Sequence, residues 1–191
     1  MILQISPKER SFAEAIIHNE FLNYIPLRHN KPLLSTIWEL SGYINDNMVI
    51  EFNYTRQDGK LKKKRVMPVS VLFSEFYFYL IAFDESNLLN YPAVFRIDRM
   101  TNTKPTGTHF EIPYRSRFND GEFRKRIQFM YSGELKTVTF EYSGVLEAIL
   151  DKLPTAKILN NENGVYTISA ESYGNGIYMW LNAQGEKVKI L

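Results

Sequence analysis

The stretch from residue 48 to 110 constrains the fold most, because its hydrophobic pattern has a period of two. Apolar or aromatic side chains occupy alternate positions from Met48 to Tyr54, which predicts a strand, and Asp58-Gly59 follows as a hairpin signal. Further strands are predicted over residues 61–73, 76–83, 93–97 and 101–108. Five short, curled strands predict a small barrel, since closure removes exposed strand edges.

The residues before this stretch predict two helices. Ser6-Pro7-Lys8-Glu9 has the features of a helix start with a capping box, so we expect a helix from there to about Tyr24. Pro26 and Pro32 bracket a linker. The second helix is predicted from one apolar face with spacings i, i+4, i+7 and i+11, formed by Leu33, Ile37, Leu40 and Ile44.

The remaining residues predict a second β-containing segment. After a short helix over residues 119–130, the expected order is β-α-β-β-α-β, which is that of a ferredoxin-like sandwich. Gly174-Asn175-Gly176 is interpreted as a helix-entry turn, and Gly185 as the left-handed residue after a helix. We therefore predict an α+β fold with three segments: N-terminal helices and linker (1–47), a five-stranded barrel (48–112) and a C-terminal extension (113–191).

Composition narrows the function classes. The chain has no cysteine, which excludes disulfides, thiol catalysis and cysteine-ligated zinc. No apolar run approaches the roughly 20 residues that span a bilayer, and no signal peptide is recognisable, so a cytoplasmic protein without a membrane partner is expected. The three histidines are scattered and no catalytic or metal-binding motif is present. We therefore predict no enzyme activity, no metal and no cofactor.

A net charge of +2 is too small to imply nucleic acid binding, so local clusters have to be considered. In a strand, Lys62 and Lys64 would occupy one face, and Lys63 and Arg65 the other. One interpretation is a solvated edge strand that uses lysine against aggregation. Arg65 differs, because it adjoins an apolar stretch that enters the core.

Arginines and tyrosines suggest a site on the same module. Arg96 and Asp98 would share one strand face, if the strand extends that far, as an ordinary ion pair. Alternatively Arg96, Arg99 and Arg65 form an anion clamp, because guanidinium groups match phosphate geometry. Tyr79 lies opposite the predicted core face of its strand, where a tyrosine near arginines can stack on a base or donate to a phosphate.

At these residues the sequence resembles the WYL domain family. The matching elements, in order, are residues 50–54, Arg65-Val66-Met67-Pro68, Phe78-Tyr79-Leu80 followed by Ala82 and Asp84, and Phe95 to Met100. Phe78 replaces the family's tryptophan, which should preserve the barrel because Phe78 is assigned to the core. The tail, with Tyr178-Met179-Trp180-Leu181, Gly185-Glu186 and Val188, resembles the C-terminal extension that commonly follows this domain.

The resemblance implies an Sm-like barrel that binds a ligand in a basic groove, in the effector-sensing part of a bacterial transcriptional regulator. The implied ligand is a nucleic acid or nucleotide, and the implied assembly is a homodimer. Carried over by position, the site residues are Tyr79, Arg96 and Arg99, followed by Arg65, Tyr54 and Thr55.

One departure from the family leaves the function open. The residues before Leu33 are too few for the family's N-terminal helix-turn-helix, so operator DNA is expected to be bound only through such a domain outside this chain. Alternative functions are a stand-alone nucleic-acid-binding accessory module and a pure assembly module, in which the C-terminal extension dimerises and the barrel is a spacer.

Overall fold

The computed structural model describes residues 27–86, 91–111 and 117–191, together with positions 11 and 25. The chain separates into two compact units, residues 1–32 and 33–191, and both β-rich segments lie in the second unit. The helix predicted from Ser6 to about Tyr24 falls almost entirely outside the described residues. The segment boundaries predicted at 47/48 and 112/113 stay predictions.

Helix α2 (Leu34–Asn45) confirms the second predicted helix. Leu40 on its apolar face is fully buried in a core cluster with residues of the first sheet, and Leu33, Ile37 and Ile44 pack against the same cluster. The helix is followed by Asn47, whose φ of 49° is a left-handed conformation that asparagine tolerates.

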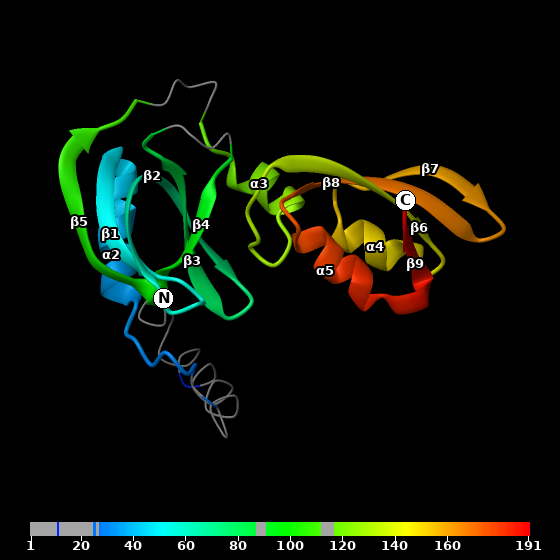
Figure 1. Cartoon of the computed structure of the whole chain (residues 1–191), viewed down its shortest axis with the longest axis horizontal. Coiled ribbons are helices and arrows are strands. Elements are labelled where there is room, and N and C mark those ends of the chain that lie inside the picture. Colours follow the sequence, from blue (N-terminus) through cyan, green and yellow to red (C-terminus); the bar gives the residue numbers. More distant parts are fainter. Residues whose placement is uncertain (1–10, 12–24, 26, 87–90, 112–116) are drawn as a thin grey trace. The chain divides into compact units, whose positions relative to one another are not determined.

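A five-stranded antiparallel sheet follows α2, with strand order β4-β3-β2-β1-β5 (Figure 1). Its strands are β1 (Met48–Thr55), β2 (Leu61–Ser74), β3 (Tyr77–Asp84), β4 (Ala93–Arg96) and β5 (Met100–His109). The five predicted strands are therefore confirmed. Within the described residues no pairing joins β4 to β5, so the ladder is open and the predicted closed barrel is not observed as a continuous ring of hydrogen bonds.

The two halves of strand β2 pair with different strands. Residues 61–66 pair with β1, and residues 66–74 pair with β3, with a register shift between Pro68 and Ser70. A bulge of this kind bends a strand and increases its twist. The lysine-rich half of β2 is therefore paired on one side only, by β1, among the residues that the structure describes. This half-strand resembles the predicted edge, although β2 as a whole lies at the centre of the sheet.

The predicted fourth strand is one residue too long. Strand β4 ends at Arg96, and Ile97–Arg99 form a short 3-10 helix, η2. The expectation that Arg96 and Asp98 share a strand face is therefore wrong. They meet because the chain turns at Ile97, which is buried in the core together with Phe95.

The C-terminal residues form a second, four-stranded antiparallel sheet with strand order β7-β8-β6-β9. Its elements are β6 (Leu135–Tyr142), α4 (Leu146–Lys152), β7 (Lys157–Glu162), β8 (Val165–Tyr173), α5 (Gly176–Ala183), η4 (Gly185–Lys187) and β9 (Val188–Ile190). The predicted β-α-β-β-α-β order is confirmed. Gly174-Asn175-Gly176 does lead into a helix, and Gly185 after α5 has a φ of 61°.

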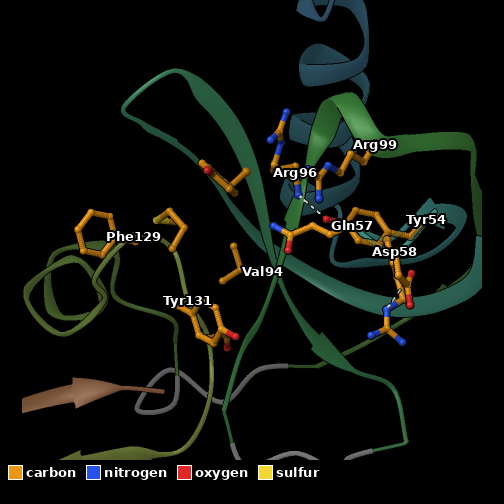
Figure 2. A pocket seen from close by; sticks show the side chains of 12 residues that line it. Tyr54, Gln57, Asp58, Val94, Arg96, Arg99, Phe129 and Tyr131 are labelled. Atoms are coloured by element: carbon orange, nitrogen blue, oxygen red, sulfur yellow. Dashed lines mark hydrogen bonds and ion pairs between the residues drawn. The ribbon is translucent and has the colours of Figure 1, made fainter. Parts of the chain in front are cut away.

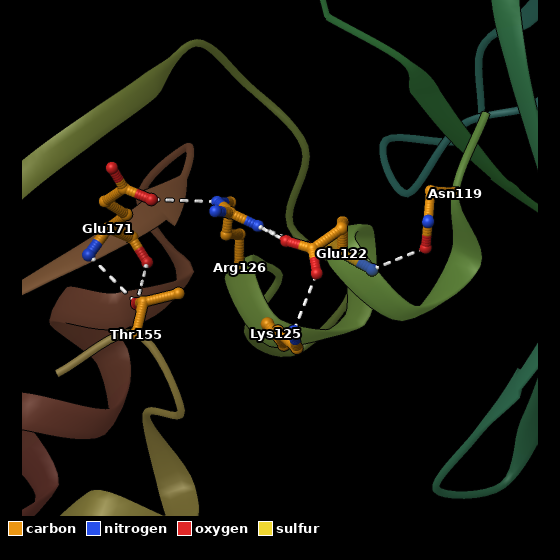
Figure 3. Close-up of polar contacts among 6 residues, drawn as sticks. All are labelled: Asn119, Glu122, Lys125, Arg126, Thr155 and Glu171. Atoms are coloured by element: carbon orange, nitrogen blue, oxygen red, sulfur yellow. Dashed lines mark hydrogen bonds and ion pairs between the residues drawn. The ribbon is translucent and has the colours of Figure 1, made fainter. Parts of the chain in front are cut away.

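Helix α3 (Asp120–Arg126) lies between the two sheets in sequence and ends earlier than predicted. The side chain of Asn119 caps it by accepting a hydrogen bond from the Glu122 N–H at 3.0 Å. Arg126 in the last turn bonds both Glu122 and Glu171 of β8, at 2.6 and 2.9 Å (Figure 3). These contacts connect α3 to the second sheet.

A third core cluster connects α3 to the first sheet. Phe123 and Ile127 are buried against Leu72 of β2 and Ile81 of β3, and Tyr173 of β8 packs on the same cluster. No helix within the described residues combines the length and apolarity needed to cross a bilayer.

Candidate ligand-binding site

A cavity of about 530 Å³ lies on the first sheet and is bordered by the loop that follows α3 (Figure 2). Strand and hairpin residues of the first sheet form most of its wall, and one loop of the C-terminal part forms the rest. The lining residues are Tyr54, Arg56, Gln57, Asp58, Tyr79, Val94, Arg96, Arg99, Phe129, Met130, Tyr131 and Ser132.

Strand register explains why the predicted site residues meet. Tyr79 and Arg96 are directly opposed on β3 and β4. Tyr54 is opposed to Met100, the first residue of β5, so Arg99 at the end of η2 comes directly before the residue that faces Tyr54. Directly opposed side chains lie about 5 Å apart on one face of a sheet. Four of the six predicted residues, Tyr54, Tyr79, Arg96 and Arg99, therefore line the same cavity.

Arg96 is held by its neighbours. Its Nε and Nη2 atoms donate to the two carboxylate oxygens of Asp98 at 3.0 and 2.8 Å. Its guanidinium carbon lies 3.4 Å from the centre of the Tyr77 ring, and its backbone N–H donates to Tyr54 Oη at 3.3 Å. Burial lowers the pKa of Arg96, but the hydrogen bonds that it donates to Asp98 and the negative charge of that carboxylate outweigh this effect and raise the pKa overall. Arg96 is therefore a fixed cation whose charge is largely compensated.

Arg99, unlike Arg96, has no carboxylate partner among the residues that the structure describes. It is half-buried and lines the cavity, yet its side chain forms no hydrogen bond or ion pair with any residue that the structure describes. The only acidic residue among the lining residues, Asp58, lies 3.8 Å from Arg56. The cavity therefore contains an uncompensated guanidinium group, which favours an anionic ligand.

Tyr79 supplies a neutral hydrogen-bond donor. Burial raises the pKa of its phenol, although the charge of Arg96 acts in the opposite direction. The hydroxyl therefore keeps its proton at neutral pH and can donate to an anion beside Arg99.

Two predicted residues lie outside the cavity. Arg65 donates from Nη2 to Glu85 at 3.0 Å and to Thr108 at 3.4 Å, so it is engaged elsewhere on the sheet. Thr55 is the last residue of β1 and does not line the cavity. The structure therefore does not place these two residues with the other four.

The loop from Phe129 to Ser132 was not predicted as part of the site. Phe129 and Met130 have φ angles of 52° and 53°, two consecutive left-handed residues that no local sequence signal indicates. Ser132 at the end of the loop donates a hydrogen bond to the carbonyl of Pro92, just before β4.

The glycines of Gly174-Asn175-Gly176 pack against this loop, and they are the sequence feature from which a close backbone contact could have been predicted. A Cβ atom on Gly176 would lie 2.1 Å from the carbonyl oxygen of Gln128, and one on Gly174 would lie 2.6 Å from that of Ser132. The glycines therefore allow the loop backbone to approach α5 closely. The hairpin residues Arg56 and Gln57 were also missed, because the turn was recognised only as a connection.

The chemistry of the lining residues is that of anion recognition: three arginines, three tyrosine hydroxyls and the exposed rings of Phe129 and Tyr131. Rings and guanidinium groups together suit a ligand with planar and anionic parts. Among the described residues no cluster of three or more His, Asp or Glu side chains could hold a metal ion.

Comparisons with known proteins agree with the resemblance noted in the sequence. Residues 36–105 match the model of the WYL domain family. No curated protein matches the chain.

Two of the solved structures to which the chain is similar are described here. One is proteasome accessory factor B/C (PafBC) of Arthrobacter aurescens, with 21% identity, a TM-score of 0.42, and coverage of 84% of this chain and 25% of that one. The other is a CRISPR Cas-related protein, with 16% identity, a TM-score of 0.51, and coverage of 81% and 46%. The second likeness shows a shared fold. This chain spans less than half the length of either structure.

Proposed function

We propose that this chain, whose residues 36–105 match the WYL domain family, is the ligand-sensing part of a transcriptional regulator. The ligand is an anion of the nucleotide or nucleic acid type, bound in the cavity between Tyr54, Tyr79 and Arg99. A ligand can change a regulator only by binding one conformation more tightly than another.

The observation that carries this proposal is the uncompensated charge of Arg99 in a partly enclosed cavity. A cation removed from part of its water without a carboxylate partner is costly unless an anion occupies the site. Arg96 has its own carboxylate, Asp98, so its contribution is to fix the wall of the cavity and to add a weaker positive field.

The fold of the regulator is part of the proposal. The strand order of the first sheet, the bend of β2 and the turn at η2 support an Sm-like barrel. The strand order of the second sheet and its β-α-β-β-α-β sequence support a ferredoxin-like sandwich.

The proposal also covers the protein's activity, location and assembly. In this proposal the cavity binds its ligand without transforming it, and the protein acts in the cytoplasm as a homodimer joined through residues 113–191. Operator DNA is contacted through a helix-turn-helix outside residues 33–191.

The test is a calorimetric titration with a 5′-phosphorylated deoxydinucleotide. Arg99→Gln should weaken binding about 10- to 100-fold, since a charge-assisted hydrogen bond contributes about 1.5–3 kcal/mol. Arg65→Gln is the matched control, because it removes an arginine that lies outside the cavity. Equal losses in both variants, with unchanged melting temperatures, would contradict the assignment of the site.

A further inference from the structure

Strand β7 forms one edge of the second sheet (Figure 1). It pairs with β8, and no other described strand lies along its second side. All of its residues, from Lys157 to Glu162, are exposed. Because a strand at an edge presents unpaired N–H and C=O groups, β7 offers a template on which a further strand can pair.

The other described edges of the two sheets are protected against such pairing. Strands β9 and β4 have only three and four residues. Strand β5 contains Pro105, which has no N–H to donate. The first half of β2 carries Lys62, Lys63 and Lys64, so pairing with a copy of itself would bring lysine against lysine, which is destabilising. Strand β7 has neither a proline nor a run of like charges.

The charges of β7 lie at its two ends and have opposite signs. Lys157 begins the strand, Glu162 ends it, and residues 158–161 between them are uncharged. Glu162 accepts a hydrogen bond from the neutral side chain of Asn160 at 2.8 Å, but neither Lys157 nor Glu162 forms an ion pair with any described residue. An antiparallel strand of the same sequence would place a glutamate opposite each lysine. The edge is therefore complementary to itself in charge.

The middle of β7 exposes apolar surface. Ile158 is 45% exposed and Leu159 is 59% exposed. In a self-paired strand, Ile158 would lie diagonally across from Leu159 of the second copy, within reach of side chains of that size. The register shift next to Leu159 twists the strand, and a two-fold axis would repeat the same twist in the partner. Removal of this apolar surface from water would favour the contact.

We infer that a second copy of this chain docks on β7 by antiparallel pairing of the two β7 strands. The two-fold axis lies between Leu159 and Asn160, so that Lys157 of each copy faces Glu162 of the other. The second sheets of the two copies then join into one continuous sheet. This inference rests on the homodimer of the proposed function and names the surface that joins it. Such a symmetric contact closes at two copies and leaves no β7 edge free.

A second copy is favoured over an unrelated extended peptide because the edge matches its own sequence in both charge order and apolar positions. A pair of short strands is a small interface, and small interfaces are weak. The dimer should therefore dissociate on dilution.

Sedimentation velocity of the full chain over a range of protein concentrations measures the dissociation constant of the dimer. The test variants are Lys157→Glu and Glu162→Lys, each of which sets like charges against each other at both ends of the strand pair. The double variant, Lys157→Glu with Glu162→Lys, restores opposite charges in reversed order. Glu186→Lys is the matched control, because it makes the same change at an exposed residue just before β9, the opposite edge of the sheet. Far-UV circular dichroism and the melting temperature show whether each variant is folded.

Each single reversal should raise the dissociation constant about 10-fold or more, since symmetry repeats the change at both ends. The double variant should dimerise as the wild type does. An equimolar mixture of Lys157→Glu and Glu162→Lys should also recover the dimer, because each variant supplies the charge that the other has lost. Glu186→Lys should leave the dissociation constant unchanged.

Several results would overturn the inference. A wild-type dissociation constant in both single variants rejects pairing through β7 and leaves the homodimer to another surface. A wild type that stays monomeric at every concentration rejects the homodimer as well, and leaves the edge of β7 to a strand of another protein. A mixture of the single variants that stays monomeric, or an equal loss in Glu186→Lys, reduces the effect to net charge and rejects the pairing. The ligand part of the proposed function is tested separately by Arg99→Gln.

Discussion

At the scale of single residues, two arginines three positions apart have different roles. Arg96 is fixed by the carboxylate of Asp98 and by the Tyr77 ring, whereas Arg99 has no such partner among the described residues. The difference arises because the chain leaves the β conformation after Arg96, so that Asp98 folds back toward it. In this chain, Arg96 is therefore a structural cation and Arg99 is a cation available to a ligand.

Replacing Asp98 with asparagine should destabilise the protein. The Asp98 side chain is 5% exposed and that of Arg96 is 20% exposed, so the variant leaves a largely buried guanidinium group without its carboxylate. Breaking a buried pair in this way costs about 3 kcal/mol. Urea denaturation followed by tryptophan fluorescence measures the change.

Asp58→Asn provides the comparison for Asp98→Asn. Asp58 pairs with Arg56 at 3.8 Å, and about half of each side chain is exposed, so the cost should be at most about 1 kcal/mol. If both substitutions have the same effect, the Arg96–Asp98 pair does not hold the cavity wall as argued.

At the scale of elements, Glu51 joins three strands. It lies on β1 and bonds Lys63 on β2 and Lys104 on β5. These hydrogen bonds lower the pKa of Glu51 from 4.5 to about 2. The carboxylate therefore adds stability above pH 4.5, the value expected for the unfolded chain, and this contribution is lost as the pH falls toward 2.

Glu51→Gln should accordingly flatten the dependence of melting temperature on pH between about 4.5 and 2. The effect should shrink in added salt, because both lysine partners of Glu51 are solvent-exposed and their charges are screened. Lys63→Gln should reproduce part of the flattening, since the bond from Lys63 is the largest cause of the pKa shift. A pH dependence identical to that of the wild type would show that the three-strand contact does not persist in solution.

The contact of α5 with the cavity loop gives a second prediction at this scale. Gly176→Ala would place a Cβ atom 2.1 Å from the Gln128 carbonyl oxygen, so the backbone must move. Overpacking of this kind costs about 1–3 kcal/mol. Because Gln128 leads directly into Phe129, dinucleotide binding should weaken as well, as measured by calorimetry.

Gly42→Ala is the matched control for Gly176→Ala. A Cβ atom at Gly42, inside α2, would meet nothing within 4 Å. Alanine is favoured over glycine in a helix by up to about 1 kcal/mol, so this variant should be neutral or stabilised and should keep its affinity. A loss of stability in both variants would point to a general intolerance of alanine rather than to the loop contact.

At the scale of the whole molecule, local patterns predicted the elements but only part of the site. The period-two pattern after Met48 and the apolar face around Leu40 identify strands and a helix, because these signals depend on near neighbours. The end of β4 at Arg96 was missed, since burial of Ile97 in the core decides it. The left-handed turn at Phe129 was also missed, because packing against glycines about 45 residues later in the chain shapes the loop.

The cavity wall formed by residues 129–132 lies outside residues 36–105, the part of the chain that matches the WYL family. Under the proposed function, substitutions in that loop would alter which ligand is preferred while the arginines and tyrosines of residues 36–105 stay unchanged. The sequence of residues 129–132 can change independently of the lining residues within 36–105. A change of ligand specificity under that proposal needs only one short loop to change, and the residues by which the family is recognised stay the same.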